Sequence, residues 1–210
     1  MKKFLSLVLA LVMTMSLVTV SAGAKDFSDD GSITYKEAVD VISGIGVVDG
    51  YSGGDFKPTE VLTRGAAAKI ICNLILGPTT ASALSASSAP FKDVPVSNTF
   101  AGYITYCAQE KIINGYPDGT FRPEAPITRQ EMATMLYRYW KLQGGKYTAK
   151  DDVLAGYQDR GEVADWALEA MSWTVQSGII VGMTPTTLNP ADGATRAQVA
   201  LVLVNYLKLN

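Results

Sequence analysis

Three arginines recur at nearly constant spacing, each directly after a threonine: Arg64, Arg129 and Arg196. Threonine is a typical N-cap residue, so each arginine falls in the first turn of a helix, where the helix dipole disfavours a cation. A structural position there would favour Asp, Glu or Pro. Guanidinium donors beside free helix N–H groups suit an anion. We therefore expect some of these arginines to bind an anionic ligand; the alternative is pairing with Glu60 or Glu124, or packing of the stem.

The arginines belong to a repeated sequence pattern, whose clearest copy spans residues 115–132, with weaker copies at offsets of 65 and 67 residues. Each repeat begins with an aromatic-x-Asp motif and continues through an amphipathic first helix, a tight turn and a strongly apolar second helix. Thr128 with Glu131, and Thr195 with Gln198, have the spacing of a capping box. The same spacing at Thr34 predicts a capping box on the first helix of the first repeat.

Length and composition indicate a globular repeat protein of 210 residues, with 48% hydrophobic and 18% charged residues. The N-terminal lysines, apolar run and Ala-x-Ala site predict a secretory signal peptide, with a retained membrane anchor as the alternative. The formal net charge of −2 argues against nucleic acid and anionic membranes as partners. The expected organisation is a signal peptide (1–24), three repeats (25–77, 91–141 and 157–210) and two linkers (78–90 and 142–156).

The sequence offers little for catalysis or metal binding. It contains no histidine, and no paired carboxylates form a recognisable motif, so we expect no enzyme and no cofactor. The residues from Asp26 to Glu37 match the ligand spacing of a calcium loop, but the other two repeats show no such loop, so a dockerin-like calcium module is a minor alternative. Cys72 and Cys107 are expected to be free and buried, with a disulfide as the alternative.

The aromatic-x-Asp start, the sequence Gly-Tyr-Pro-Asp-Gly-Thr-Phe-Arg-Pro and the following Ile-Thr-Arg-Gln-Glu together resemble the S-layer homology motif, in three tandem copies. The resemblance covers residues 27–207. It implies a mainly α fold, with three helix-loop-helix repeats arranged with pseudo-threefold symmetry around a central three-helix bundle and grooves between adjacent repeats.

The resemblance also implies a set of groove residues at the matching positions: the arginines Arg64, Arg129 and Arg196, the turn residues Gly50, Tyr51, Gly115 and Tyr116, and the tryptophan Trp166. The match is uneven. Only the third repeat has the tryptophan; Tyr35 and Phe100 follow the aligned positions in the other two. The third repeat has lost the Tyr-Pro-Asp-Gly turn, so we expect the three grooves to bind unequally.

The function implied by the resemblance is noncovalent anchoring of an exported protein to the bacterial cell wall. The partner would be a secondary cell-wall polysaccharide, commonly one bearing pyruvate ketals, and no membrane contact is expected after signal cleavage. The first alternative is a surface scaffold that binds proteins in the same grooves. The sequence leaves open the sugar, the occupied grooves, the cargo, and whether an effector lies on a partner protein or a longer parent chain.

Overall fold

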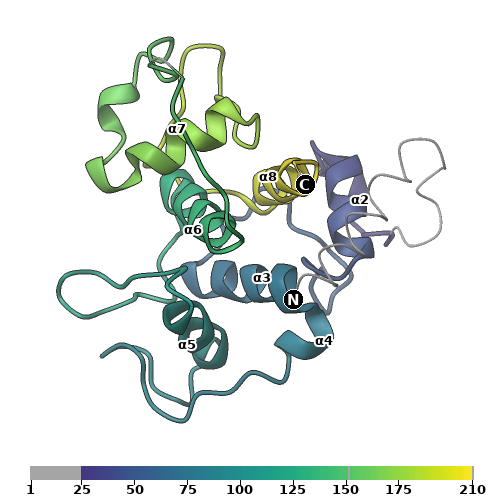
Figure 1. The fold of residues 1–210 in the computed structure, drawn as a ribbon. Coiled ribbons are helices and arrows are strands. Elements are labelled where there is room, and N and C mark those ends of the chain that lie inside the picture. The colour runs from purple at the N-terminus through teal and green to yellow at the C-terminus, as the bar shows by residue number, and fades with distance from the viewer. Residues whose placement is uncertain (1–24, 151, 210) are drawn as a thin grey trace.

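The computed structural model describes residues 25–150 and 152–209, so the predicted signal peptide (1–24) lies outside the described residues. Helices form the regular structure of the described part (Figure 1). In chain order they are η1 (Asp30–Ser32), α2 (Lys36–Gly44), α3 (Arg64–Leu76), α4 (Pro78–Ala81), α5 (Ala101–Gln109), α6 (Arg129–Leu142), η2 (Arg160–Glu162), η3 (Asp165–Ala167), α7 (Leu168–Gln176) and α8 (Arg196–Leu207). The prediction of a mainly helical chain of three helix-loop-helix repeats is confirmed. No described helix is both long and apolar enough to span a bilayer.

Each repeat carries a short first helix and a longer second helix. The first helices α2, α5 and α7 have nine residues each, whereas α3, α6 and α8 have 13, 14 and 12. Both predicted capping boxes of the second helices form: Thr128 and Thr195 cap α6 and α8, and the side chains of Glu131 and Gln198 accept from the N-cap backbone in return. In α3 the third position is Ala66, so the cap there is one-sided.

The predicted capping box on the first helix of the first repeat is wrong. Helix α2 begins at Lys36, with Tyr35 as its N-cap and without a side-chain cap bond. Glu37 therefore stands at the second helical position, one residue too early to reach back to the cap. Lys36 instead pairs with Asp40 one turn along the helix, at 2.9 Å.

The helices pair between repeats. Each first helix packs on the second helix of the preceding repeat: α5 on α3 and α7 on α6, while α2 of the first repeat packs on α8 of the third. Figure 1 shows the result, with α3, α6 and α8 around the middle and α2, α5 and α7 outside them. Because the last repeat covers the first helix of the chain, the three repeats share one core.

Backbone hydrogen bonds between repeats recur in the same cyclic order. The N–H of each repeated arginine donates to a carbonyl just before the next arginine along the cycle: Arg64 to Ala125, Arg129 to Asp192 and Arg196 to Glu60, at 2.9–3.0 Å. Isolated β-bridges accompany them at Val61–Thr195, Thr63–Pro126 and Thr128–Gly193. The first repeat thus contacts the second, the second contacts the third, and the third contacts the first.

The aspartate of each aromatic-x-Asp motif holds the turn of its own repeat. Its carboxylate accepts from two successive backbone N–H groups at 2.7–3.0 Å: Asp29 from Phe56 and Lys57, Asp93 from Phe121 and Arg122, and Asp159 from Leu188 and Asn189. The second residue of each pair has a positive φ of 52–58°. Burial alone would raise the pKa of Asp29 and Asp159, but the backbone N–H donors outweigh it and lower both pKa values.

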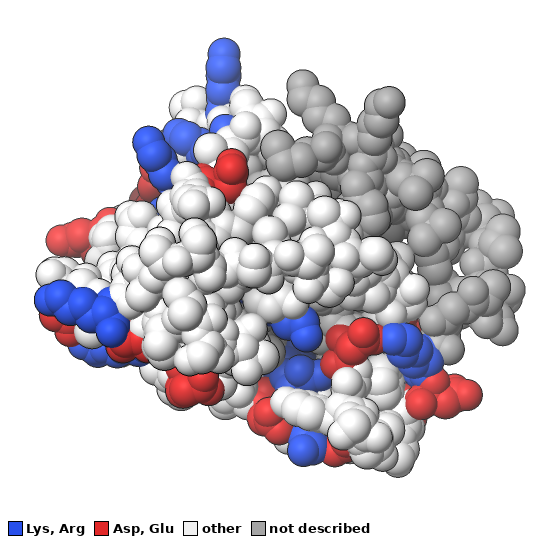
Figure 2. Space-filling view, turned by 90° about the horizontal axis from the view of Figure 1, so that it is seen from below, with Lys and Arg blue, Asp and Glu red and all other residues white. Residues whose placement is uncertain are grey.

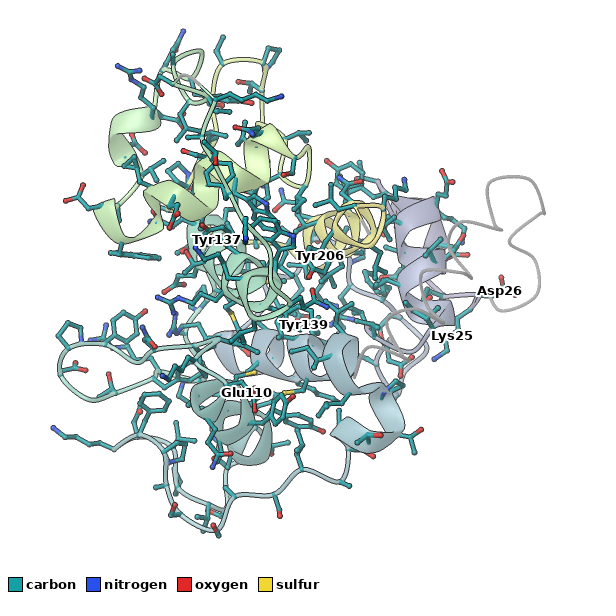
Figure 3. The ribbon with its side chains drawn as sticks, in the orientation of Figure 1. Lys25, Asp26, Glu110, Tyr137, Tyr139 and Tyr206 are labelled. Carbon is teal, nitrogen blue, oxygen red and sulfur yellow. The ribbon has the colours of Figure 1, made fainter. Side chains whose placement is uncertain are left out.

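Aromatic side chains fill the region where α6, α7 and α8 meet. The rings of Trp140 and Trp173 stack at 4.8 Å between centroids, and Trp173 contacts Tyr137 and Tyr206. Figure 3 shows Tyr137, Tyr139 and Tyr206 near the middle of the molecule. This cluster ties the second repeat to the third.

The two cysteines are free and buried, as predicted. Cys72 on α3 and Cys107 on α5 have their sulfur atoms 3.5 Å apart, which is a nonbonded contact. The contact with the Cys72 sulfur, together with burial, raises the pKa of Cys107, so its thiol is protonated at neutral pH. Both segments predicted as linkers also contribute to the core, through the buried side chains of Ala81 on α4 and Leu154.

Candidate ligand-binding site

The three repeated arginines are buried, and each reaches into the following repeat. The Nε atoms donate at 2.7–2.8 Å to carbonyls at equivalent positions: Arg64 to Phe121, Arg129 to Leu188 and Arg196 to Phe56. Their side chains therefore connect the repeats. Neither Glu60 nor Glu124, the acids that the sequence suggested as partners, is bonded to these Nε atoms. Burial lowers the pKa of Arg129 and Arg196, although a guanidinium group stays charged at neutral pH.

A second contact distinguishes Arg64 from its two equivalents. Arg129 and Arg196 donate from Nη2 to backbone carbonyls, at 2.8 Å to Val181 and 2.6 Å to Asp49. Arg64 instead donates from Nη1 to the carboxylate of Glu131 in an ion pair with little solvent exposure. Only the second repeat has an acid at the third position of its second helix, so only Arg64 meets a carboxylate there.

The predicted turn glycines lie where a side chain would clash. A Cβ atom on Gly115 would lie 2.4 Å from Cε1 of Phe91, and one on Gly50 would lie 2.5 Å from Cε1 of Phe27. These rings belong to the aromatic-x-Asp motifs, so each glycine lets the start of its repeat pack against its turn. The requirement for glycine at both positions is therefore explained by packing.

The turn tyrosines lie beside the arginine of the preceding repeat. The guanidinium carbon of Arg64 is 4.7 Å from the ring centre of Tyr116, and that of Arg196 is 4.7 Å from the ring centre of Tyr51. The Tyr116 hydroxyl donates to Glu131 at 3.1 Å. The structure thus brings the predicted arginines and tyrosines together in two of the three places.

Arg64 and Tyr116 line a groove of about 300 Å³, which we call groove A. Its other polar and aromatic lining includes Glu131, Arg138 and Trp166. Arg64 comes from the first repeat and Trp166 from the third, whereas Tyr116, Glu131 and Arg138 come from the second. The sequence predicted grooves between adjacent repeats and named Trp166 as a groove residue, and the structure places this side chain of the third repeat in the groove between the first two.

A smaller groove of about 50 Å³, groove B, has the same construction one repeat further along. Arg129 lies beside Gly182 and Met183 of the third repeat, and Tyr35 of the first repeat supplies the aromatic ring. At the third equivalent place, Phe100 packs so closely over the residue after Arg64 that a Cβ on Gly65 would lie 2.5 Å from its ring. Grooves A and B therefore differ in size, and the three places differ in their aromatic residue.

Arg138 is a groove residue that the sequence analysis missed. It lies on α6 and donates weakly from Nη1 to the carbonyl of Ile112 at 3.5 Å. With the Asn114 amide oriented to face its donors, Arg138 Nη2 also donates to Asn114 at 3.3 Å. The signal in the sequence was helical spacing, because Glu131 and Arg138 lie seven residues apart on one face of α6.

The residues of the calcium-loop alternative do not gather around a common point. Asp30 pairs with Lys36 at 3.1 Å, and Figure 3 places Asp26 at the outer edge of the molecule. Within residues 25–150 and 152–209, no group of three or more His, Cys, Asp or Glu side chains could hold a metal ion.

Charge on the visible surface is mixed in sign. Figure 2 shows one face, on which acidic and basic side chains alternate along the lower margin around a broad uncharged area. That face offers no continuous basic field of the kind that binds nucleic acid.

Comparisons with known proteins place these features in a wider context. A family model described as the S-layer homology domain matches residues 26–68, 90–133 and 153–200. The chain is 38% identical over 156 residues to a cellulosome-anchoring protein of Acetivibrio thermocellus, which covers 74% of this chain and 34% of that protein. It is 27% identical over 206 residues to the surface-layer 125 kDa protein of Lysinibacillus sphaericus, covering 96% and 16%.

An amylopullulanase of Thermoanaerobacterium thermosulfurigenes is 25% identical over 186 residues, covering 88% of this chain and 10% of that protein. The chain thus spans about a third or less of the length of each of these relatives. The relative that is named as an enzyme, the amylopullulanase, is therefore a much longer protein than this chain.

Proposed function

The chain belongs to the S-layer homology domain family, a family of cell-surface anchoring modules, and from that premise we propose that it attaches an exported protein to the bacterial cell wall by holding a secondary cell-wall polysaccharide in groove A. The relatives named as cellulosome-anchoring and surface-layer proteins support anchoring at the cell wall. The polysaccharide and its groove are the specific parts of the proposal.

The observation that carries the proposal is the exposed indole of Trp166 on the rim of groove A. Trp166 is 56% exposed, more than any other large hydrophobic residue in the described part of the chain. An indole offers a flat apolar surface on which the C–H face of a sugar ring can pack. Arg64, Tyr116 and Arg138 lie in the same groove and supply hydrogen-bond donors for hydroxyl and anionic groups.

We propose that the sugar carries a negative charge, as a pyruvate ketal does through its carboxylate. Groove A contains two arginines and one glutamate, so its lining is positive overall. Arg64 would contribute through Nη2, the guanidinium nitrogen that bonds neither Phe121 nor Glu131. In groove B, Arg129 would take the same role with less space, and Arg196 with Tyr51 would form a third, weaker place.

Trp166→Ala tests the groove without disturbing the core. Because the indole is exposed, we expect stability to change by less than about 0.5 kcal/mol. Binding to purified cell-wall sacculi should fall by about tenfold or more, as for a truncated aromatic anchor. Leu168→Ala, also on an exposed side chain nearby but outside the lining of groove A, is the matched control and should bind normally.

Treatment of the sacculi tests the identity of the ligand. Chemical extraction of the secondary polymer should abolish sedimentation of the protein with the sacculi, and mild acid, which hydrolyses ketals, should weaken it. Undiminished binding to extracted sacculi would contradict the polysaccharide and favour a protein partner. Binding that survives mild acid but not extraction would remove the ketal alone.

The module is proposed to bind and not to catalyse. The long relatives leave about two thirds or more of their own length outside the match. We propose that the activity being anchored is supplied outside this module, by a longer parent chain or by a partner protein.

A further inference from the structure

Arg138 occupies a position at which the other two repeats carry asparagine. The equivalents at offsets of 65 and 67 are Asn73 on α3 and Asn205 on α8. Each asparagine donates from Nδ2 to a carbonyl at the equivalent place before its turn, Asn73 to Val47 at 3.1 Å and Asn205 to Ile179 at 3.3 Å. Arg138 makes the same bond, to Ile112, at 3.5 Å. An uncharged amide therefore suffices for the structural role, and the charge of Arg138 is additional to it.

That charge has no acidic partner among the described residues. The ion pairs in this part of the chain include none with Arg138, and its two bonds go to a neutral carbonyl and a neutral amide. Both bonds are longer than the usual 2.7–3.2 Å of a good N–H···O bond. A half-buried cation in such surroundings gains most from an anion brought by a ligand.

Arg64, in the same groove, differs from Arg138 because it already has an acidic partner. Its side chain is only 8% exposed, Nε is bonded to Phe121, and Nη1 is paired with the carboxylate of Glu131. The Arg64–Glu131 pair carries no net charge. The net positive charge of groove A therefore comes from Arg138.

We propose that Arg138 is the residue through which groove A recognises the negative charge of its ligand, and that the repeated arginine Arg64 mainly holds the groove together. The inference rests on the proposed function, because it assigns the charge-reading residue of that same site. The chemistry recognised is an anionic substituent on a sugar, within reach of a guanidinium group and beside the indole of Trp166. The other two places have Asn73 or Asn205 instead of Arg138, so there the repeated arginine is the only one of these two cations available to an anion.

The test compares Arg138→Asn with Arg160→Asn in binding to purified sacculi over a range of NaCl concentrations. Both substitutions remove one positive charge, but Arg160 is exposed, pairs with Asp152 and lies outside the lining of groove A. We expect Arg138→Asn to weaken binding by about tenfold or more and to flatten its dependence on salt. Arg160→Asn should bind as the unsubstituted protein does.

Arg138→Lys separates charge from shape, because lysine keeps the cation without the planar fork. We expect it to retain most of the salt dependence. Equal binding and equal salt dependence in Arg138→Asn and the unsubstituted protein would overturn the inference. Weaker binding in both Arg138→Asn and Arg138→Lys, with no change in salt dependence, would also overturn it, because residue 138 would then act through packing.

Failure of the proposed function gives a different result. The unsubstituted protein would then not sediment with untreated sacculi, or would do so equally after polymer extraction. Thermal unfolding of each variant provides the folding control, and Arg138→Asn is expected to fold because the same asparagine serves in the two equivalent places.

Discussion

Gly115 packs directly against the ring of Phe91, and this contact sets what the position tolerates. In Gly115→Ala the new Cβ would lie 2.4 Å from Cε1 of Phe91 and 2.6 Å from the Thr120 carbonyl oxygen. One of these neighbours is backbone, so the strain cannot be relieved by turning a side chain alone. We expect a loss of about 1–3 kcal/mol in the free energy of unfolding, measured by urea denaturation.

Gly161→Ala is the matched control, because a Cβ there meets nothing within 4 Å. Its effect should lie within about 0.5 kcal/mol. If Gly115→Ala left stability unchanged but abolished binding to sacculi, the glycine would serve the ligand and not the packing of the turn.

Residue spacing predicted where the arginines, glycines and tyrosines of the site lie, but only part of what they do. The helix dipole argument identified Arg64, Arg129 and Arg196 as unusual in a first turn. It could not show that each side chain extends away from its own helix to a carbonyl about 57–140 residues distant in sequence, because that carbonyl belongs to another repeat. Arg138 went unnoticed because a single cation on an amphipathic helix is usually a solvated residue.

At the scale of the element, the end of α5 differs from the ends of its two equivalents. Lys111 follows this helix with φ of 58°, a left-handed conformation, whereas the equivalent residues Gly46 and Gly178 have φ of 73° and 68°. Glycine adopts this conformation without the Cβ strain that lysine incurs. Lys111→Gly should therefore raise the free energy of unfolding by about 0.5–1 kcal/mol. This is the net gain, because glycine also increases the conformational entropy of the unfolded chain, which offsets part of the relieved strain.

Lys111→Ala distinguishes this effect from the loss of charge. Alanine removes the ammonium group but keeps the Cβ, so we expect no gain in stability. Equal stabilisation by glycine and alanine in urea denaturation would assign the effect to the charge at Lys111 and contradict the backbone explanation.

The elements themselves followed closely from local sequence signals. The capping boxes at Thr128 and Thr195 were predictable because both partners lie within one turn of the helix. The box at Thr34 failed because the helix starts one residue later than the motif suggests, at Lys36. Such a shift depends on what Tyr35 and its neighbours pack against, which the local pattern does not contain.

At the scale of the molecule, the pairing of first helices with second helices of other repeats was not predictable. The apolar faces show that each helix packs on another, but three similar repeats offer similar faces to one another. The observed pairing comes with bonds between repeats, such as those from Arg64 to Phe121 and from Arg196 to Phe56, which no local sequence pattern contains. The pairing of helices between repeats also explains how three units of about fifty residues, each too small for a stable core of its own, form one common core.

The pairing of helices between repeats predicts that the three repeats unfold together. Deleting residues 157–210 removes α8 from α2 and α7 from α6, and it leaves the carbonyls of Phe56, Pro58 and Glu60 without their donors from the third repeat. Apolar residues on α2, among them Val39 and Ile42, would become exposed. We expect the shortened protein to lose its cooperative urea transition and its near-ultraviolet circular dichroism.

A nicked protein provides the control for that deletion. A protease site engineered at the exposed residues 148–150 breaks the chain before the third repeat but leaves that repeat in place. Because the contacts between repeats are noncovalent, the nicked protein should keep a single transition, at a midpoint somewhat lower than that of the intact chain. A shortened protein that unfolds cooperatively at the intact protein's midpoint would show that the first two repeats are stable alone, and that α8 adds nothing to the stability of α2.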